Sequence, residues 1–305
     1  MIEIPADVPM TAQLAQQLQQ ELAEAYPFVR RELLATTAYG RPIGALAIGT
    51  GPRKVLYAAA FHANEWITAP VLLRFAAEYA DAIETDGMIF DRSARNLATE
   101  TTVYLIPMLN PDGVDLVTGV LRPGQPEYDR ALELARNYPN IPFARGWKAN
   151  LNGVDLNLSF PAGWLMAREI KFGQGYTKPG PRDYVGRAPL DQPESFALYD
   201  YTRRVDPDLV IALHSQGEVI YWQYGGIEVP GARELGEQFA ALSGYELAQT
   251  PYNSSFAGYK DWFIQAFRRP GYTVEVGSGV NPLPLSEADG IYQKVLGILV
   301  RGASA

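Results

Sequence analysis

The stretch Phe61-His-Ala-Asn-Glu-Trp-Ile-Thr68 marks the point where a buried apolar segment gives way to a helical pattern. Before it, residues 54–61 form an almost unbroken hydrophobic run, which is typical of a strand covered on both faces. After it, apolar residues recur at helical spacing, and we expect a helix over 65–83. His62 and Glu65 therefore fall, three residues apart, on the turn between a core strand and a helix.

The second of the chain's two histidines, His214, occupies a similar place. It ends another buried run, residues 208–214. Both histidines are thus expected at the carboxyl ends of core strands, the edge where open α/β sheets place their ligands. Either histidine alone is explained by a hydrogen bond to a backbone carbonyl. Together with Glu65 they suit a borderline-soft cation, and we predict one Zn²⁺ per chain held by His62, Glu65 and His214.

Length and composition limit the class of protein. The 305 residues are 47% hydrophobic, which is ample for a core, and they contain no cysteine, which excludes disulfides and thiolate metal sites. A formal charge of −8 and a pI near 5.0 argue against a nucleic-acid partner and against polybasic membrane attachment. Neither a leader pattern nor an apolar run of roughly 20 residues is present. We therefore expect a soluble, cytoplasmic protein with a small ligand, provided that no leader precedes this sequence.

Strand and helix patterns alternate along the chain, which favours an α/β fold with a mixed, mostly parallel central sheet flanked by helices. Nothing marks a domain boundary, so we expect one domain over 1–305, with residues 1–27 as a helical segment packed on it. Residues 107–113 hold two prolines and Asp-Gly and are expected to be a loop. The loop-rich section 117–192 is expected to form the wall of the site. The remaining expected helices are 10–26, 192–205, 231–242, 259–266 and 285–300, and the remaining strands are 28–36, 43–49, 101–106, 219–222 and 271–276.

Several motifs occur in the order and spacing of the zinc carboxypeptidase superfamily, which the chain resembles from about Tyr39 to Pro284. They are His62-Ala-Asn-Glu65-Trp-Ile-Thr, Asn110-Pro-Asp-Gly, Gly153-Val-Asp-Leu-Asn157, His214-Ser and Thr273-Val-Glu275. The resemblance implies the mixed-sheet fold of metallocarboxypeptidases. Within the superfamily, four segments look most like the bacterial γ-D-glutamyl-L-diamino-acid endopeptidases, which cut cell-wall peptides. These are Gly40-Arg-Pro-Ile, the Phe61–Thr68 stretch, Gly258-Tyr-Lys-Asp-Trp and Val276-Gly-Ser-Gly-Val-Asn-Pro-Leu-Pro.

Two residues are expected to take part in catalysis. Glu275 lies in an otherwise apolar strand, where an ionisable residue is costly unless it is paired or used. An ion pair with an arginine or lysine would explain it, but the resemblance matches it to the catalytic glutamate, the general base for the metal's water. Where relatives carry an arginine just after a tryptophan, this chain has Lys148. The resemblance implies that Lys148 stabilises the oxyanion as a point charge; the alternative is an ordinary surface lysine.

Departures from the superfamily pattern point to the substrate. Exopeptidases have Asn-Arg where this chain has Asn157-Leu158, and leucine cannot hold a terminal carboxylate, so ordinary C-terminal trimming is disfavoured. The resemblance places Asn157 in substrate binding. Lys260 takes the place of the residue that lines the specificity pocket, where an ammonium would favour the far carboxylate of diaminopimelate. The alternative for Lys260 is a helix-start lysine that points to water.

The remaining substrate contacts are less defined. Tyr252 matches the mobile substrate-binding tyrosine of the family only if one residue is inserted before Asp261. Asn64 replaces an arginine that relatives use to contact the substrate. The anchor for the D-glutamyl α-carboxylate is therefore left open among Arg145, Arg182 and Arg187.

These features predict a zinc peptidase that cuts the γ-D-glutamyl-meso-diaminopimelate bond of peptidoglycan peptides, with a small muropeptide as its partner. One alternative is a zinc carboxypeptidase that releases acidic C-terminal residues. The other is a catalytically silent muropeptide-binding protein, against which the retained Glu275 argues. The sequence does not indicate an oligomeric state.

Overall fold

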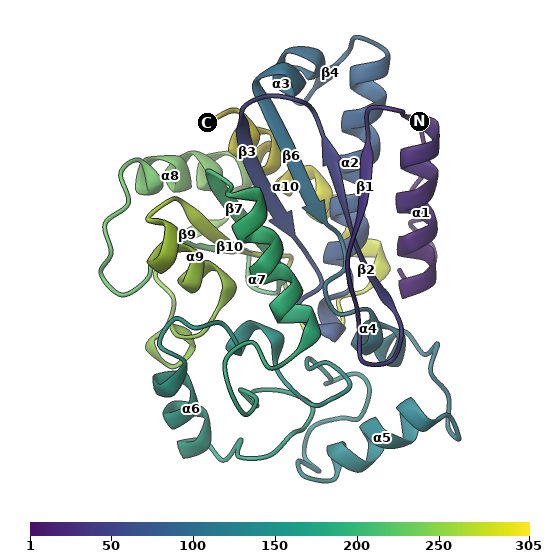
Figure 1. The fold of residues 1–305 in the computed structure, drawn as a ribbon, viewed down its shortest axis with the longest axis vertical. Coiled ribbons are helices and arrows are strands. Elements are labelled where there is room, and N and C mark those ends of the chain that lie inside the picture. Colours follow the sequence, from purple (N-terminus) through teal and green to yellow (C-terminus); the bar gives the residue numbers. More distant parts are fainter.

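The structure, a computed structural model, describes residues 1–305 and is built around an eight-stranded mixed sheet (Figure 1). The strands are ordered β1-β2-β6-β3-β7-β10-β8-β9. A separate two-stranded hairpin is formed by β4 and β5. The strand bounds are β1 Arg30–Thr36, β2 Pro42–Ile48, β3 Arg53–Ala58, β4 Met88–Ile89, β5 Arg92–Ser93, β6 Thr101–Ile106, β7 Leu209–Ser215, β8 Val219–Tyr221, β9 Glu246–Ala248 and β10 Gly271–Val276.

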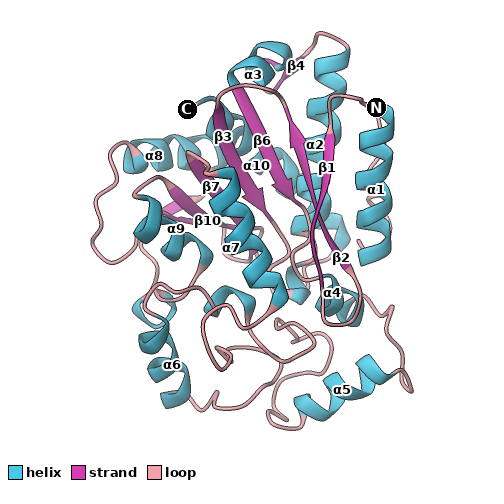
Figure 2. Cartoon of the chain, in the orientation of Figure 1, coloured by secondary structure: helices cyan, strands magenta, loops and turns pink.

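Helices cover both faces of the sheet (Figure 2). The α-helices are α1 Ala12–Ala25, α2 Thr68–Glu84, α3 Ala94–Glu100, α4 Pro111–Val117, α5 Pro126–Ala135, α6 Trp164–Gly173, α7 Pro193–Val205, α8 Ala232–Ser243, α9 Tyr259–Phe267 and α10 Ala288–Ser304. Short 3₁₀ turns are η1 Ala63–Glu65, η2 Leu156–Leu158, η3 Tyr252–Ser254 and η4 Leu285–Glu287. No helix combines the length and the apolar character that crossing a bilayer requires.

The core lies in two layers, one on each face of the parallel centre formed by β6, β3, β7 and β10. Val55 and Tyr57 of β3 face a layer shared with α1, α2, α8 and α10. Leu56 and Ala58 face the opposite layer, which includes residues of α7 and α9. Because neighbouring residues of a strand point to opposite faces, a strand buried on both sides has the unbroken hydrophobic run seen in the sequence. The predicted fold class is confirmed.

The expected first helix packs on this core. Thr11 caps α1, and its side-chain oxygen accepts a hydrogen bond from the Leu14 N–H at 3.2 Å. Ala15 and Leu22 of α1 are fully buried in the layer that α2 and α10 share.

The segment after β3 differs from the prediction, because a longer connection separates the strand from the helix and carries two of the predicted metal ligands. β3 ends at Ala58 and α2 begins at Thr68, so both elements are three residues shorter than expected at this junction. Residues 59–67 form a tight connection that contains η1. His62 and Glu65 are thereby released from the sheet and from the long helix and lie on a separate short turn.

The prediction of a loop over 107–113 is correct for residues 107–110 and wrong for 111–113, where a helix begins. Pro111 begins α4, and proline is tolerated there because the first N–H of a helix needs no partner within the helix. The Asn110 side chain caps this helix by accepting a hydrogen bond from the Gly113 N–H at 3.1 Å. Proline also begins α5 at Pro126, inside the section expected to be irregular. The rest of 117–192 is mostly loop, at the end of the molecule that β3 and β6 point toward (Figure 2).

Candidate active site and metal centre

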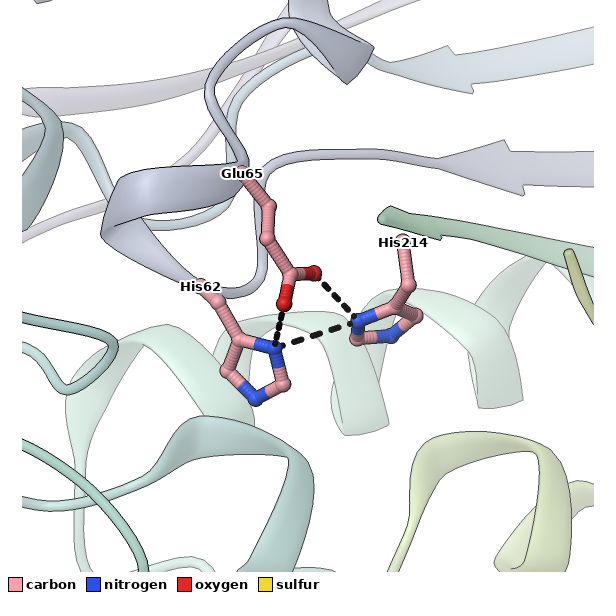
Figure 3. Close-up of side chains that lie close together, drawn as sticks. All are labelled: His62, Glu65 and His214. Atoms are coloured by element: carbon pink, nitrogen blue, oxygen red, sulfur yellow. Dashed lines mark hydrogen bonds and ion pairs between the residues drawn. The ribbon is translucent and has the colours of Figure 1, made fainter. Parts of the chain in front are cut away.

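Three predicted ligands converge at the carboxyl ends of β3 and β7 (Figure 3). Glu65 lies between the two imidazoles: its Oε1 is 2.9 Å from Nδ1 of His62, and its Oε2 is 3.0 Å from Nδ1 of His214. The two Nδ1 atoms are 3.3 Å apart. One donor atom from each of the three residues lies within 4.8 Å of the others, and all three residues are buried.

The donor set fits a zinc ion. The Nε2 of His62 lies 2.9 Å from Oδ1 of Asp155, a carboxylate that can only accept, so Nε2 is the donor and Nδ1, which faces the other two residues, is the nitrogen that would bind a metal. His214 also directs Nδ1 to the cluster, while its buried Nε2 has no hydrogen-bond partner. Two imidazole nitrogens and a carboxylate facing one point are a ligand set that zinc prefers. His62, Glu65 and His214 would hold the ion.

In the absence of metal, the charge of the ligand cluster depends on which of its side chains carry a proton. Burial by itself lowers the pKa of His62, but the charges of Glu65 and Asp155 outweigh it and raise that pKa to about 9. Burial opposes ionisation of Glu65, yet the charges of His62 and Lys148 bring its pKa well below its ordinary value. Burial lowers the pKa of His214, which keeps that imidazole neutral, as a ligand must be. Zinc therefore competes with a proton on His62.

Glu275 lies beside this cluster. On β10 it is paired in register with His214 of the parallel neighbour β7. Its carboxylate forms no ion pair within 4.0 Å, so the ion-paired alternative is not what the structure contains. Burial, followed by the charge of Glu65, raises the pKa of Glu275 to about 8. An unpaired carboxylate with a raised pKa next to a metal centre has the properties of a general base.

Lys148 reaches the same centre from the loop-rich wall. Its Nζ lies 2.7 Å from Oε1 of Glu65, with the side chain 19% exposed. It is therefore not an ordinary surface lysine. Burial alone lowers the pKa of Lys148, but Glu65 and Glu275 raise it, so the ammonium stays charged.

Two pockets meet at the centre. The smaller has a volume of about 220 Å³ and is lined by residues that include His62, Asn157, Leu158 and Lys260. The larger, of about 780 Å³, is lined by residues that include Asn64, Arg145 and Asn281. Residues common to both linings are Lys148, Arg182, Tyr221 and Glu275. A substrate that extends through both pockets would thus cross the metal centre.

Two of the three predicted substrate-binding residues line the smaller pocket, and the third lines neither pocket. Asn157 lines the smaller pocket, and its Oδ1 accepts a hydrogen bond from the Tyr259 N–H at 3.0 Å. Lys260 also lines this pocket but does not point to water: it is 4% exposed, and its Nζ donates to the Asp261 carboxylate and to the Gln223 carbonyl. Its charge is therefore already balanced. Tyr252 is 64% exposed and lines neither pocket.

Of the three arginines left open as carboxylate anchors, Arg182 lines both pockets and Arg145 lines the larger one. Arg187 lines neither, and its side chain is 88% exposed. The structure therefore separates Arg187 from the site.

Other residues of the site were not assigned a role from the sequence. Asp155 lies in the Gly153-Val-Asp-Leu-Asn157 motif. Its place in this motif was the sequence signal that could have identified it as a residue of the site. Lys171 and Asp183 are buried and line the smaller pocket, where they form an ion pair at 2.6 Å. No periodicity or spacing in the sequence connects these two residues with the metal ligands.

Comparisons with known proteins identify relatives of the chain and solved structures with the same fold. The zinc carboxypeptidase family profile matches residues 15–291. The chain is 46% identical over 286 residues to γ-D-glutamyl-L-diamino acid endopeptidase 1 of Lysinibacillus sphaericus, covering 93% of this chain and 69% of that protein. It is 40% identical to a protein of Bacillus subtilis, covering 92% of this chain and 74% of that one. Among solved structures, carboxypeptidase A of Helicoverpa armigera superposes with a TM-score of 0.74 at 21% identity, covering 99% of this chain and 75% of that one.

Proposed function

The chain belongs to the zinc carboxypeptidase family, and we propose that this zinc peptidase hydrolyses the γ-D-glutamyl-meso-diaminopimelate bond of peptidoglycan peptides. The family uses zinc, and the cluster of His62, Glu65 and His214 would supply the ligands. The observation that carries the finer assignment is the similarity to a γ-D-glutamyl-L-diamino acid endopeptidase over 93% of the chain, combined with Leu158 in the substrate pocket.

Leu158 supports an activity other than the trimming of ordinary peptides. Its side chain is 9% exposed and packs with Trp164, Val185 and Ala257. An apolar side chain cannot pair with a terminal carboxylate, and burying such a charge without a partner is costly. Substrate carboxylates must therefore be met by other residues.

The chain's own residues divide the catalytic work. Zinc bound by the three ligands would lower the pKa of water and polarise the scissile carbonyl. Glu275 accepts the proton of the attacking water and returns it to the leaving amine. Lys148 places a positive charge where the carbonyl oxygen becomes negative. Asp155 holds the His62 ring in the orientation and tautomer that ligation needs.

The cytoplasmic location inferred from the sequence stays a prediction, which fractionation of the producing cells would test. The oligomeric state is a separate question that size-exclusion chromatography with light scattering answers.

The test of the proposed function is digestion of L-Ala-γ-D-Glu-meso-diaminopimelate by the zinc-loaded protein, with mass spectrometry of the products. We expect L-Ala-D-Glu and free diaminopimelate. An ordinary peptide that ends in glutamate is the matched substrate, and Glu275→Gln is the matched inactive protein. Release of glutamate from the ordinary peptide without cleavage of the tripeptide would instead indicate an acidic-residue carboxypeptidase. Binding of the tripeptide without cleavage would indicate a silent binder.

A further inference from the structure

The wall of the smaller pocket contains a cluster of two cations and one carboxylate, formed by Lys171, Arg182 and Asp183. Lys171 Nζ lies 2.6 Å from Oδ1 of Asp183, and Arg182 Nε lies 2.7 Å from Oδ2 of the same residue. One negative charge therefore serves two positive ones, which leaves one uncompensated positive charge among these three side chains. The charge of Asp155 also acts on Arg182, but that carboxylate is paired with His62. The neighbouring Lys260 and Asp261 pair, by contrast, is neutral and buried.

The uncompensated charge is presented on Arg182. Lys171 and Asp183 are buried, whereas the Arg182 side chain is 40% exposed. Only its Nε–H is hydrogen bonded, so both terminal amino groups remain for a ligand. A guanidinium held at Nε and free at its two amino groups is prepared for a carboxylate, which accepts two parallel hydrogen bonds from this fork.

Hydrogen bonds to the backbone of both neighbours of Arg182, Pro181 and Asp183, hold this segment in place. The Pro181 carbonyl accepts hydrogen bonds from the N–H groups of Lys148 and Ala149, at 2.7 and 2.9 Å. The Asp183 N–H donates to Oδ2 of Asp155, the residue that orients His62, at 3.2 Å. Arg182 is therefore fixed relative to the reacting groups, as a residue that determines specificity has to be.

Arg182 also lies where the two pockets meet, together with Lys148, Tyr221 and Glu275. In the substrate proposed above, a free carboxylate flanks the scissile amide on each side: the α-carboxylate of D-glutamate and that of the L-centre of diaminopimelate. We infer that Arg182 binds a substrate carboxylate beside the scissile bond and thereby selects the substrate, in a chain whose residue 158 carries no charge. This inference rests on the proposed function.

The test compares Arg182→Gln and Arg182→Lys with wild type on three tripeptides. The first is L-Ala-γ-D-Glu-meso-diaminopimelate, the second carries an α-carboxamide on D-glutamate, and the third carries a carboxamide on the L-centre of diaminopimelate. Arg187→Gln, which changes an arginine outside both pockets, is the matched control. Asp183 keeps Lys171 as a partner in the Arg182 variants, so they should retain the wild-type fold and zinc content.

We expect Arg182→Gln to lower kcat/KM for the first tripeptide by about 10- to 100-fold, mainly through KM, with a smaller loss for Arg182→Lys. The loss should disappear on the amidated tripeptide that lacks the bound carboxylate, which identifies which of the two Arg182 contacts. Arg187→Gln should match wild type throughout.

An unchanged kcat/KM in both Arg182 variants, or equal losses on all three tripeptides, would overturn the inference while leaving the proposed function in place. A wild-type protein that cleaves none of the three would overturn the proposed function and this inference with it. Should Arg182→Gln fail to fold, the same comparison of three tripeptides with Arg182→Lys decides the matter.

Discussion

Replacement of Asp155 by asparagine tests whether this carboxylate prepares His62 for zinc. Asp155 accepts the hydrogen bond of His62 Nε2 at 2.9 Å and, with Glu65, raises the pKa of His62 to about 9. Below that pKa, metal-free His62 carries a proton that zinc must displace. The affinity of the wild-type protein for zinc should therefore fall by about tenfold for each unit of pH below 9 through this group.

The Asp155→Asn substitution has two opposing effects on zinc affinity. Loss of the carboxylate that orients a histidine ligand typically weakens metal binding by about 10- to 100-fold, or about 1.4 to 2.7 kcal/mol. The substitution also lowers the pKa of His62, so that less of the metal-free protein carries the competing proton at neutral pH. The full loss should therefore appear at pH 9 and a smaller one at pH 7.

The assay is competition with a chelator at both pH values, together with calorimetry in buffers of different ionisation enthalpy. Wild type should release about one proton from His62 per zinc at pH 7.5, and Asp155→Asn clearly fewer. Arg187→Gln, which changes a residue outside both pockets, is the control. Equal proton release by wild type and Asp155→Asn, with an equal affinity difference at pH 7 and pH 9, would refute the reasoning.

Three further substitutions address the catalytic and pocket residues. Glu275→Gln should lower kcat by about 10²- to 10⁴-fold with an unchanged zinc content; retained turnover would remove Glu275 as the base. Lys148→Met should lower kcat by about 10²- to 10³-fold, measured on zinc-loaded protein, and a change confined to KM would contradict its oxyanion role. Lys260→Ala leaves the buried Asp261 carboxylate unpaired and should destabilise the fold by about 3 kcal/mol in denaturant unfolding. Lys260→Ala/Asp261→Asn should recover much of that stability, and no recovery would show that the pair is not the cause.

The metal ligands could be predicted from the sequence because the chain has only two histidines and both occupy the same kind of position. Both histidines end hydrophobic runs, and parallel core strands bring their carboxyl ends to one edge of the sheet. The same runs define β3 and β7, and their burial on both faces explains why no alternation of polar residues is visible in them. The same two hydrophobic runs therefore predict both the central strands of the sheet and the position of the metal centre at the sheet's edge.

The wall of the site could not be predicted in the same way. The segment 117–192 has no strand or helix periodicity over most of its length. It is held in place by individual hydrogen bonds, such as those that the Pro181 carbonyl accepts from the N–H groups of Lys148 and Ala149. Prolines that indicated loops in fact begin helices α4 and α5. The burial of Lys260 depends on its pairing with Asp261 and on the Gln223 carbonyl, a contact between residues 37 positions apart that no local pattern contains.

The central claim is that His62, Glu65 and His214 hold one zinc ion next to Glu275. Anomalous diffraction from crystals of the zinc-loaded protein, recorded on both sides of the zinc absorption edge, tests it directly. The account predicts one peak per chain at about 2.0–2.2 Å from a nitrogen of each histidine and an oxygen of Glu65. A fully loaded crystal with no peak there, or with its peak bound by other residues, would contradict it.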